Sequence, residues 1–385
     1  MDKGGYMAII KNLYLWLIKG ISLWSYKSQL DKNMVVVIVD FEEDINEFLS
    51  FIEREEPNND YKITVFHHSR IKNKIKIIRN VNYIERNIFN KIKMIRIMQK
   101  SLFIVVDNYI VELGSIKLNS SKVCIQIWHA NGALKRFGLN KSNEYSPQDI
   151  KRYINVYKKY DKIIVGSEKM IDVFRDSFAI NEEDIFMKIG SLRTDKYFRD
   201  VEHKTNFKIG KSKKVILYTP TYRDTENELK LNINEMNKLK TEGYSLVIRT
   251  HPAIEVDLPK SLSDFVINGN EFSLQYLIEV SDILVTDYSS IAMEFSILNK
   301  PIYFYCYDLE SYKKDTGLIK QFEKEICSPV YKDTPSLEEA ILTKVVQASD
   351  VQIFNEKWNT YTTGDACESL LMYLELRKKK YEVTN

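Results

Sequence analysis

Two histidines stand within two residues of apolar runs that have the composition of buried strands. His129 follows VCIQIW, and His251 follows YSLVIR in the second half of the chain. An imidazole with a pKa near 6.5 is mostly neutral at pH 7 and can accept a proton as a general base. A lone histidine is more often structural, but two of them after strands in separate halves favour catalysis. His67, His68 and His203 lie in less suggestive settings.

Hydroxyl groups and an arginine follow another apolar run. KVILYT ends at Thr219 and is followed closely by Thr221 and Arg223. Hydroxyls beside a guanidinium suit a phosphate group, because arginine forms charge-assisted hydrogen bonds to phosphate oxygens. This segment is therefore a candidate phosphate site.

Serines follow a fourth run of this kind. DILVTD ends at Asp287, and Ser289 and Ser290 then open the predicted helix IAMEFSILN. Free backbone N–H groups and the helix dipole at such a start can bind an anion. The alternative is an ordinary helix N-cap at Ser289, worth about 1 kcal/mol.

Two polar loops complete the candidate residues. ANGALKRFG after His129 contains Gly132 and Lys135 and leads into a cationic turn, while GSLRTDKYF contains Arg193 and Asp195 just before a polar segment. In open α/β sheets, ligands bind beyond the carboxyl ends of the strands. All of these residues therefore depend on where the strands end.

The elements that must position these residues alternate along the chain. Short β-branched runs predict parallel strands at 34–40, 62–68, 102–107, 123–128, 162–166, 214–219, 244–249, 282–287 and 301–305. Helical stretches such as 88–99 and 149–160 lie between them. This alternation predicts an α/β protein with parallel sheets. The polar segment at 199–214 predicts two Rossmann-like domains, 1–205 and 206–385, with the final helices able to pack back on the first.

Composition excludes several classes of protein. Lysine and arginine number 56 against 53 aspartates and glutamates, so net charge indicates no nucleic-acid partner. The four cysteines form no CxxC pair, and Cys124 and Cys306 lie in apolar runs, which indicates reduced core residues in a cytosolic protein. The sequence contains no stretch of about 18 apolar residues, so no membrane-spanning helix is predicted, and no secretory signal is indicated.

Two segments carry the composition of a membrane contact. Residues 70–100 interleave basic residues with isoleucine, methionine and phenylalanine, with Glu85 as their single acid, and residues 7–24 are rich in leucine, isoleucine and tryptophan around Lys11 and Lys19. These patterns favour peripheral binding to an anionic membrane surface. A solvated helix face for the first segment, and a helix packed on the protein's own core for the second, are equally open alternatives.

Several motifs of cofactor and metal chemistry are absent from the sequence. There is no Walker loop, no GxGxxG after the first strand, no HExxH and no D-x-D pair at a strand end. We therefore expect no cofactor and no metal. Positive side chains and helix ends are expected to neutralise a leaving diphosphate.

The motifs QIWHANGALKRFG, GSEKMIDVF, GSLRTDKYF, VILYTPTYRD, RTHP and VTDYSSIAMEFSILNKPIYFYCYD occur in this order over roughly residues 100 to 320. Taken together, they resemble the CDP-glycerol glycerophosphotransferase family of teichoic acid synthesis. The resemblance implies a GT-B type of fold with two Rossmann-like domains facing a central cleft. It also implies CDP-glycerol as donor, CMP as product and a prenyl-diphosphate-linked disaccharide as acceptor.

The resemblance also implies roles for individual residues. His129 matches the proposed base, with His251 as the second catalytic candidate. Gly132 and Lys135 are assigned to the acceptor. The residues that match positions around the donor are Arg193, Thr221, Arg223, His251, Ser289 and Ser290. Asp195, Thr219 and Asp287, in the same motifs, are further candidates for donor binding.

Departures from the family pattern refine this expectation. Ala130 and Ala133 resemble the primase branch, which adds the first glycerol phosphate, while Leu192 replaces a common proline and Glu294 a common aspartate. We expect a primase at the cytoplasmic face of the membrane, peripherally bound. The alternatives are a glycerol- or ribitol-phosphate polymerase of the same family, a nucleotide-sugar glycosyltransferase of GT-B fold, and a binding module without turnover.

Overall fold

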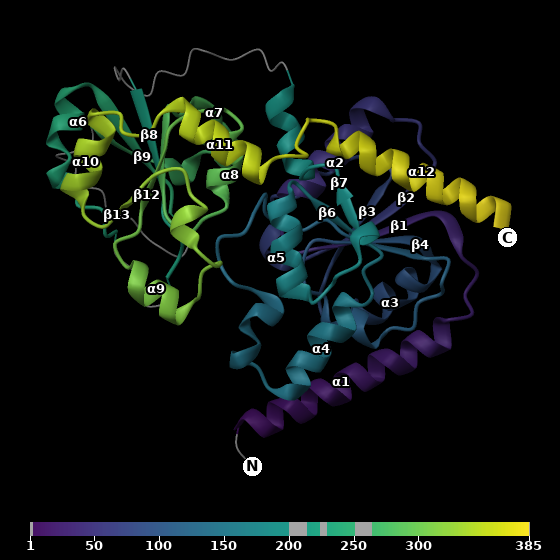
Figure 1. Cartoon of the computed structure of the whole chain (residues 1–385). Coiled ribbons are helices and arrows are strands. Elements are labelled where there is room, and N and C mark those ends of the chain that lie inside the picture. Colours follow the sequence, from purple (N-terminus) through teal and green to yellow (C-terminus); the bar gives the residue numbers. More distant parts are fainter. Residues whose placement is uncertain (1–2, 200–213, 224–228, 251–263, 385) are drawn as a thin grey trace. The chain divides into compact units, whose positions relative to one another are not determined.

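The computed structural model describes residues 3–199, 214–223, 229–250 and 264–384 (Figure 1). The chain divides into two compact units. Unit 1 comprises Met1–His129, Phe137–Phe198 and Tyr361–Asn385, and unit 2 comprises Ala130–Arg136 and Arg199–Thr360. The predicted boundary between residues 205 and 206 lies outside the described residues.

Unit 1 is built on a parallel sheet in the order β3-β2-β1-β4-β5-β6-β7. Its strands are β1 (Asp31–Val39), β2 (Lys62–His67), β3 (Val81–Glu85), β4 (Ser101–Val106), β5 (Val123–Gln126), β6 (Lys162–Val165) and β7 (Phe186–Lys188). The connections reverse direction between β1 and β4, as in doubly wound nucleotide-binding sheets. The edge beyond the carboxyl ends of these two strands is therefore the place to look for a ligand site.

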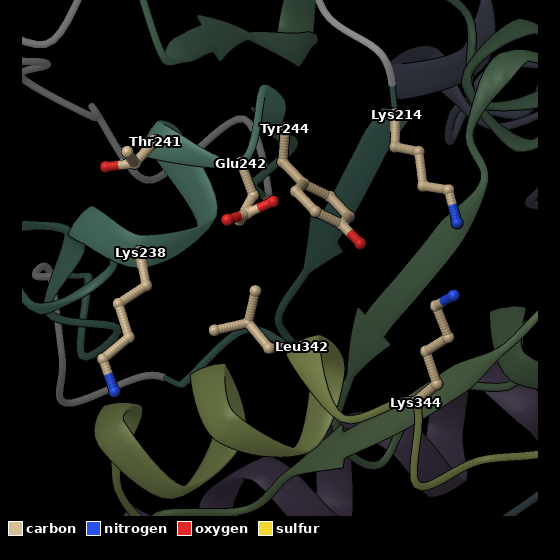
Figure 2. Close-up of a pocket in the computed structure, with 7 residues that line it drawn as sticks. All are labelled: Lys214, Lys238, Thr241, Glu242, Tyr244, Leu342 and Lys344. Atoms are coloured by element: carbon tan, nitrogen blue, oxygen red, sulfur yellow. The ribbon is translucent and has the colours of Figure 1, made fainter.

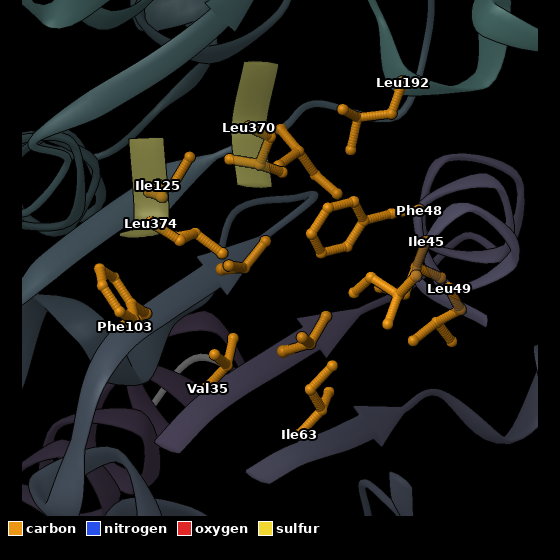
Figure 3. Close-up of a cluster of buried hydrophobic side chains, with 14 of the residues drawn as sticks. Val35, Ile45, Phe48, Leu49, Ile63, Phe103, Ile125, Leu192, Leu370 and Leu374 are labelled. Atoms are coloured by element: carbon orange, nitrogen blue, oxygen red, sulfur yellow. The ribbon is translucent and has the colours of Figure 1, made fainter. Parts of the chain in front are cut away.

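The strands of unit 1 form because their β-branched runs are buried on both faces of the sheet. All six residues of β4 are buried, and Val35 in β1 lies beside Phe103 in β4. Figure 3 shows these side chains packed with Phe48 and other residues of α2 (Glu43–Glu55). Apolar side chains from distant segments thus close one core.

The other helices of unit 1 are α1 (Lys3–Ser25), α3 (Lys91–Lys100), α4 (Pro147–Tyr157), α5 (Glu168–Phe178) and α12 (Ala366–Thr384). The helix α12 belongs to unit 1 although its sequence follows that of unit 2. Leu370 and Leu374 on this helix are buried in the same core as Val35 and Phe103 (Figure 3). The end of the chain thereby becomes part of the first sheet's packing.

Unit 2 contains a second parallel sheet, in the order β10-β9-β8-β11-β12-β13. Its strands are β8 (Lys214–Thr219), β9 (Tyr244–Ile248), β10 (Val266–Asn268), β11 (Ile283–Thr286), β12 (Ile302–Tyr305) and β13 (Val330–Tyr331). Its helices are α6 (Asn237–Thr241), α7 (Leu274–Val280), α8 (Ile291–Ser296), α9 (Leu309–Asp315), α10 (Thr334–Leu342) and α11 (Ala348–Trp358). The connections reverse between β8 and β11.

The predicted α/β architecture with two parallel sheets is confirmed. Each of the nine predicted strands corresponds to a strand of the structure within a few residues. The short edge strands β3, β7, β10 and β13 were not predicted, and the helix expected from residue 88 begins at Lys91. Edge strands have fewer buried positions, so their sequences carry a weaker apolar pattern. Cys124 and Cys306 are buried and unpaired, as predicted.

The packing of α12 leads to a prediction about stability. Leu370→Ala removes a fully buried side chain from the core of unit 1, so we expect a loss of about 2–5 kcal/mol in the free energy of unfolding. Met372 on the same helix is 58% exposed, so Met372→Ala is the matched control and should change stability by less than about 0.5 kcal/mol. Chemical denaturation measures both. Equal effects would show that α12 is not held through Leu370.

Candidate active site

Asp107 joins the loops that follow β1 and β4 at the reversal point of the first sheet. Its Oδ1 accepts a hydrogen bond from the backbone N–H of Asp40 at 3.0 Å, and its Oδ2 accepts from the N–H of Phe41 at 2.8 Å. Burial raises the pKa of Asp107 to about 8, although these N–H donors oppose the rise. The carboxyl group thereby fixes the loop after β1 and the position of Phe41.

His129 lies just beyond β5, at the same edge of the sheet. Trp128 before it has a φ of 61°, a left-handed conformation that bulky residues rarely adopt and that often marks a functional site. The imidazole stacks on Phe41, with the ring centroids 4.3 Å apart and the planes 11° from parallel. The sharp turn at Trp128 thus directs the His129 ring onto the loop that Asp107 fixes.

The hydrogen bond of His129 selects one tautomer of the ring. Nδ1 lies 3.0 Å from the carbonyl oxygen of Asp107. A carbonyl oxygen only accepts hydrogen bonds, so Nδ1 must carry the proton and the neutral ring keeps Nε2 as its proton acceptor. Burial lowers the pKa of His129 to about 4; the Asp107 carbonyl opposes this, and the charge of Arg193 adds to it. The ring is therefore neutral at physiological pH.

Arg193 holds the His129 segment from the other side. Its Nη2 donates to the carbonyl oxygen of His129 at 2.8 Å, and its Nε donates to Oδ2 of Asp44 at 2.7 Å. Asp44 lies in α2 and also accepts from the hydroxyl of Ser191 at 2.9 Å. The structure therefore brings Arg193 together with His129 in unit 1, and its predicted role in donor binding stays a prediction.

The side chain of Asp195 contacts the first turn of α12, a helix far from it in the sequence. Its two carboxylate oxygens accept hydrogen bonds from the backbone N–H groups of Ala366 and Cys367, at 3.1 and 2.8 Å. This is the geometry by which a carboxylate satisfies the free N–H groups of a first helical turn. The structure thus gives Asp195 a capping role in unit 1, and its assignment to the donor stays a prediction.

Unit 2 repeats the arrangement of Asp107 at its own reversal point. Asp287 follows β11, and its Oδ1 accepts hydrogen bonds from the backbone N–H of Thr221 at 2.9 Å and from the Thr221 hydroxyl at 2.6 Å. The hydroxyls of Thr219 and Thr286 lie 3.4 Å apart within the two strands. Asp287 therefore fixes the loop after β8, as Asp107 fixes the loop after β1.

Arg223 is held by two carboxylates in this part of unit 2. Its Nη1 donates to Asp287 at 2.7 Å, and its Nε and Nη2 donate to the two oxygens of Asp308 at 3.0 Å each. The guanidinium carbon lies 4.8 Å from the centre of the Tyr312 ring and 5.3 Å from that of Tyr288. Sequence reasoning missed Asp308, although its place after strand β12 was the available signal.

The segment Ala130–Arg136 brings Gly132 and Lys135 into unit 2. Lys135 pairs with Leu318 in an isolated antiparallel bridge, and a Cβ added at Gly132 would lie 2.9 Å from the Met293 side chain. Burial lowers the pKa of Lys135, and the charge of Asp287 opposes this shift. Lys135 thus lies near enough to Asp287 in unit 2 for the two charges to interact. Its predicted role in binding the acceptor stays a prediction.

The serines after β11 have little capping function. The Ser289 hydroxyl accepts from the N–H of Ile291 at 3.4 Å, and Ser290 is the N-cap residue of α8 without a side-chain hydrogen bond. The expected N-cap at Ser289 is therefore weak, and both serines stay candidates for the donor. His251 lies outside the described residues.

A cavity of about 720 Å³ in unit 2 contains none of the predicted site residues. Lys214, Lys238, Tyr244 and Lys344 contribute to its lining (Figure 2). Lys214 and Tyr244 are the first residues of β8 and β9, so the cavity lies at the amino ends of these strands. It is at the opposite edge of the sheet from Asp287.

The sequence matches one protein family over most of its length. Residues 22–376 match the family of CDP-glycerol:poly(glycerophosphate) glycerophosphotransferases. The chain belongs to this family. It is therefore a CDP-glycerol glycerophosphotransferase, as the motif series indicated.

Relatives of this glycerophosphotransferase include two teichoic acid glycerol-phosphate primases. It is 34% identical over 379 residues to the teichoic acid glycerol-phosphate primase of Bacillus subtilis (strain 168), covering 96% of this chain and 98% of the relative. It is 28% identical over 375 residues to the enzyme of the same name from Staphylococcus aureus (strain NCTC 8325 / PS 47), covering 95% and 98%.

Solved structures share the fold of this glycerophosphotransferase. The wall teichoic acid polymerase TagF matches with a TM-score of 0.78 at 20% identity, over 98% of each chain. A UDP-N-acetylglucosamine 2-epimerase from Listeria monocytogenes matches with a TM-score of 0.57 at 14% identity, over 89% of this chain and 95% of the other. The predicted GT-B type of fold is thereby confirmed.

The environment of His129 leads to a prediction about pH. Because burial lowers the pKa of His129 to about 4, the base stays neutral down to that pH, and we expect the acid limb of kcat/KM to be centred near pH 4. An ordinary histidine would place it near 6.5. A pH profile on protein shown to be folded measures this, and a limb near pH 6.5 would contradict it.

The same shift affects stability with a defined sign. Between about pH 6.5 and pH 4 the unfolded chain binds a proton at His129 that the folded chain does not, so stability falls as the pH falls. The free energy of unfolding of the wild type, compared with that of His129→Gln, should therefore decrease as the pH is lowered across this interval.

Proposed function

We propose that this glycerophosphotransferase acts as a primase of wall teichoic acid synthesis. It transfers glycerol phosphate from CDP-glycerol to a prenyl-diphosphate-linked disaccharide and releases CMP. The observation that carries this proposal is the single tautomer of His129, whose Nε2 is left as a base at the edge of the first sheet. The primase relatives, at 28 and 34% identity over nearly the whole chain, support this over the polymerases.

In the proposed reaction a hydroxyl of the acceptor sugar attacks the β-phosphorus of CDP-glycerol. Nε2 of His129 accepts the proton of that hydroxyl, the new P–O bond forms, and CMP leaves with the electrons of the broken bond. Phosphoryl transfer of this kind depends mainly on positioning and on electrostatic stabilisation. Arg193 contributes to positioning, because it holds the carbonyl oxygen of His129.

The donor is proposed to bind at the reversal point of unit 2. Arg223 is a guanidinium oriented in advance by Asp287 and Asp308, and Lys135 adds a second cation in the same region. Oriented cations stabilise charge that develops on a leaving diphosphate. Thr219, Thr221, Ser289, Ser290 and His251 complete the proposed donor site. A structure of a histidine variant of TagF soaked with CDPG supports a donor of this chemistry.

We also propose that the protein binds peripherally to the cytoplasmic face of the membrane, through α1. Among the described residues, no helix is long and apolar enough to cross a membrane. Side chains of α1 bond to unit 1 through polar groups, as Tyr14 does to Glu112 at 2.6 Å. Ile18 of this helix is buried, but many of its other apolar side chains are exposed: Ile9, Ile10, Leu13, Trp16, Leu17, Leu23 and Trp24. Apolar residues presented outward from a helix suit the boundary between lipid headgroups and acyl chains.

The reaction is tested by CMP release from CDP-glycerol, CDP-ribitol and UDP-sugars, each with a prenyl-diphosphate disaccharide. We expect CDP-glycerol to be the preferred donor and one CMP to be released per acceptor. His129→Ala should lower kcat by about 10²- to 10⁴-fold and leave CDP-glycerol affinity nearly unchanged.

Three outcomes separate the alternatives. Release of many CMP molecules per acceptor molecule would identify the protein as a polymerase. Turnover of UDP-sugars would identify it as a glycosyltransferase. Near-normal turnover of His129→Ala would exclude His129 as the base. A parallel loss of CDP-glycerol affinity would make His129 a ligand of the donor.

Membrane binding is tested with the double variant Trp16→Ser/Trp24→Ser. Both tryptophans are at least 69% exposed, so we expect the variant to lose binding to anionic vesicles, and high salt to release the wild type by screening. The matched control, Met372→Ser/Leu376→Ser, removes two exposed apolar residues from α12 and should bind normally. Equal binding of all three proteins would exclude α1 as the contact.

A further inference from the structure

Two arginines meet around Asp40 at the edge of the first sheet that carries His129. Asp40 follows β1, Arg70 lies in the short helical turn after β2, and Arg86 follows β3. The family motifs quoted above do not include any of the three. In a parallel sheet, residues after neighbouring strands gather at one edge, so the three residues come together although 46 positions separate the first from the last.

Asp40 orients both guanidinium groups. Its carbonyl oxygen accepts from Nε and Nη2 of Arg70, each at 3.1 Å. Its carboxylate accepts from Nη2 of Arg86 through Oδ1 and from the amide of Asn108 through Oδ2 at 3.0 Å. Every oxygen of Asp40 is therefore occupied, and the two arginines are held in fixed positions before any ligand arrives.

Each arginine keeps a hydrogen-bond donor for which the described residues offer no acceptor. Nη1 of Arg86 is buried, in a side chain that is only 13% exposed, and it has no hydrogen-bond partner among the residues that the structure describes. Nη1 of Arg70 has no partner within the described part of the chain, and that residue is exposed. Leaving a buried charged donor unpaired is costly, so this group calls for a partner such as a water molecule or a ligand oxygen. Two guanidinium groups in fixed positions suit the oxygens of a diphosphate.

The position of this pair links the proposed base to the proposed membrane helix. The guanidinium of Arg70 lies 4.6 Å from the centre of the Phe41 ring, and that ring stacks on His129. Arg86 lies close enough to Tyr14 of α1 for its charge to act on the tyrosine. That charge opposes the rise in the pKa of Tyr14 that burial and Glu112 cause. Just after Arg86, Ile88 and Phe89 are 66% and 88% exposed. The pair therefore stands between apolar residues suited to a lipid and the base suited to a sugar hydroxyl.

We propose that Arg70 and Arg86 bind the diphosphate of the lipid-linked acceptor, an inference that rests on the proposed function. The diphosphate of such an acceptor joins the lipid to the sugars. A ligand bound in this way extends its prenyl chain toward Ile88 and Phe89 and its disaccharide past Phe41 toward His129. The pair thus recognises the acceptor by charge, and His129 acts on its sugar.

The test compares two soluble acceptors in the CMP-release assay with saturating CDP-glycerol. Both carry the same disaccharide on the same short alkyl chain, one through a diphosphate and one as an uncharged glycoside. We expect Arg70→Gln and Arg86→Lys each to raise the KM for the diphosphate acceptor by about 10- to 100-fold. The kcat and the KM for the uncharged acceptor should stay within about twofold. Arg86→Lys keeps the charge opposite Asp40 and removes the second donor.

Arg79→Gln is the matched control. Arg79 is an exposed arginine of the same basic stretch, so its loss removes one charge and should leave both KM values unchanged. Thermal unfolding of each variant reports on folding, and Arg70→Gln, at an exposed position, keeps the test valid if Arg86→Lys is unstable. Equal losses on the two acceptors, or an equal effect of Arg79→Gln, would overturn the proposal.

A membrane phospholipid is the other source of phosphate chemistry at this place. Sedimentation with vesicles of phosphatidylglycerol and phosphatidylcholine distinguishes it from the acceptor. Variants that lose vesicle binding but keep the wild-type KM for the soluble diphosphate acceptor would assign the arginines to the membrane and overturn the proposal. A wild type that turns over both acceptors with equal KM overturns this inference alone. A wild type that releases no CMP overturns the proposed function itself.

Discussion

Both sheets of this protein depend on a carboxyl group placed where the strand connections reverse. At such a point two neighbouring strands send their loops in opposite directions, and the backbone N–H groups just beyond the strands lose their ladder partners. Asp107 supplies the acceptor for these groups in unit 1, and Asp287 does so in unit 2. The loops that they fix carry Phe41 and Thr221, so each candidate site begins from one buried carboxyl group.

Cations around these loops are oriented by carboxylates rather than left to solvent. Arg193 is held by Asp44, Arg86 by Asp40, and Arg223 by Asp287 together with Asp308. Removing either partner of such a buried pair would leave an uncompensated charge, which gives these pairs little freedom to rearrange. Fixed cations need little reorganisation when negative charge appears, which is the property that phosphoryl transfer requires.

The helix α1 is attached to the rest of unit 1 partly through polar side chains, and many of its apolar side chains are exposed. Glu112 is only 4% exposed and accepts from both Tyr14 of α1 and Lys91 of α3. Ser22, fully buried, accepts from the side chain of Gln99 at 2.8 Å. These polar groups and the buried Ile18 face the rest of unit 1, while apolar residues such as Trp16 and Leu13 are exposed. The two alternatives for this segment, a helix packed on the protein and a membrane contact, are therefore compatible.

Local patterns in the sequence predicted the elements and the positions of the main candidates. Central strands such as β4 were predictable because a run buried on both faces must be apolar throughout, and His129 was a candidate because it follows such a run. Order and spacing of the motifs also identified the family, because motif order survives where single residues change. The strand pattern and the place of His129 are local properties that can be read within a few residues, whereas the motif series extends over roughly residues 100 to 320.

The hydrogen-bond and ion-pair partners of these residues could be identified only from the folded structure. Arg193, whose role in donor binding stays a prediction, holds Asp44, 149 positions away, and Asp195 caps a helix that begins 171 positions later. Likewise, Lys135 lies in the short segment Ala130–Arg136, which joins unit 2 although the chain on both sides of it belongs to unit 1. A charged side chain in a loop is chemically able to serve many partners, and its own segment does not specify which one. That choice is made when strands distant in sequence align in one sheet and their loops gather at one edge.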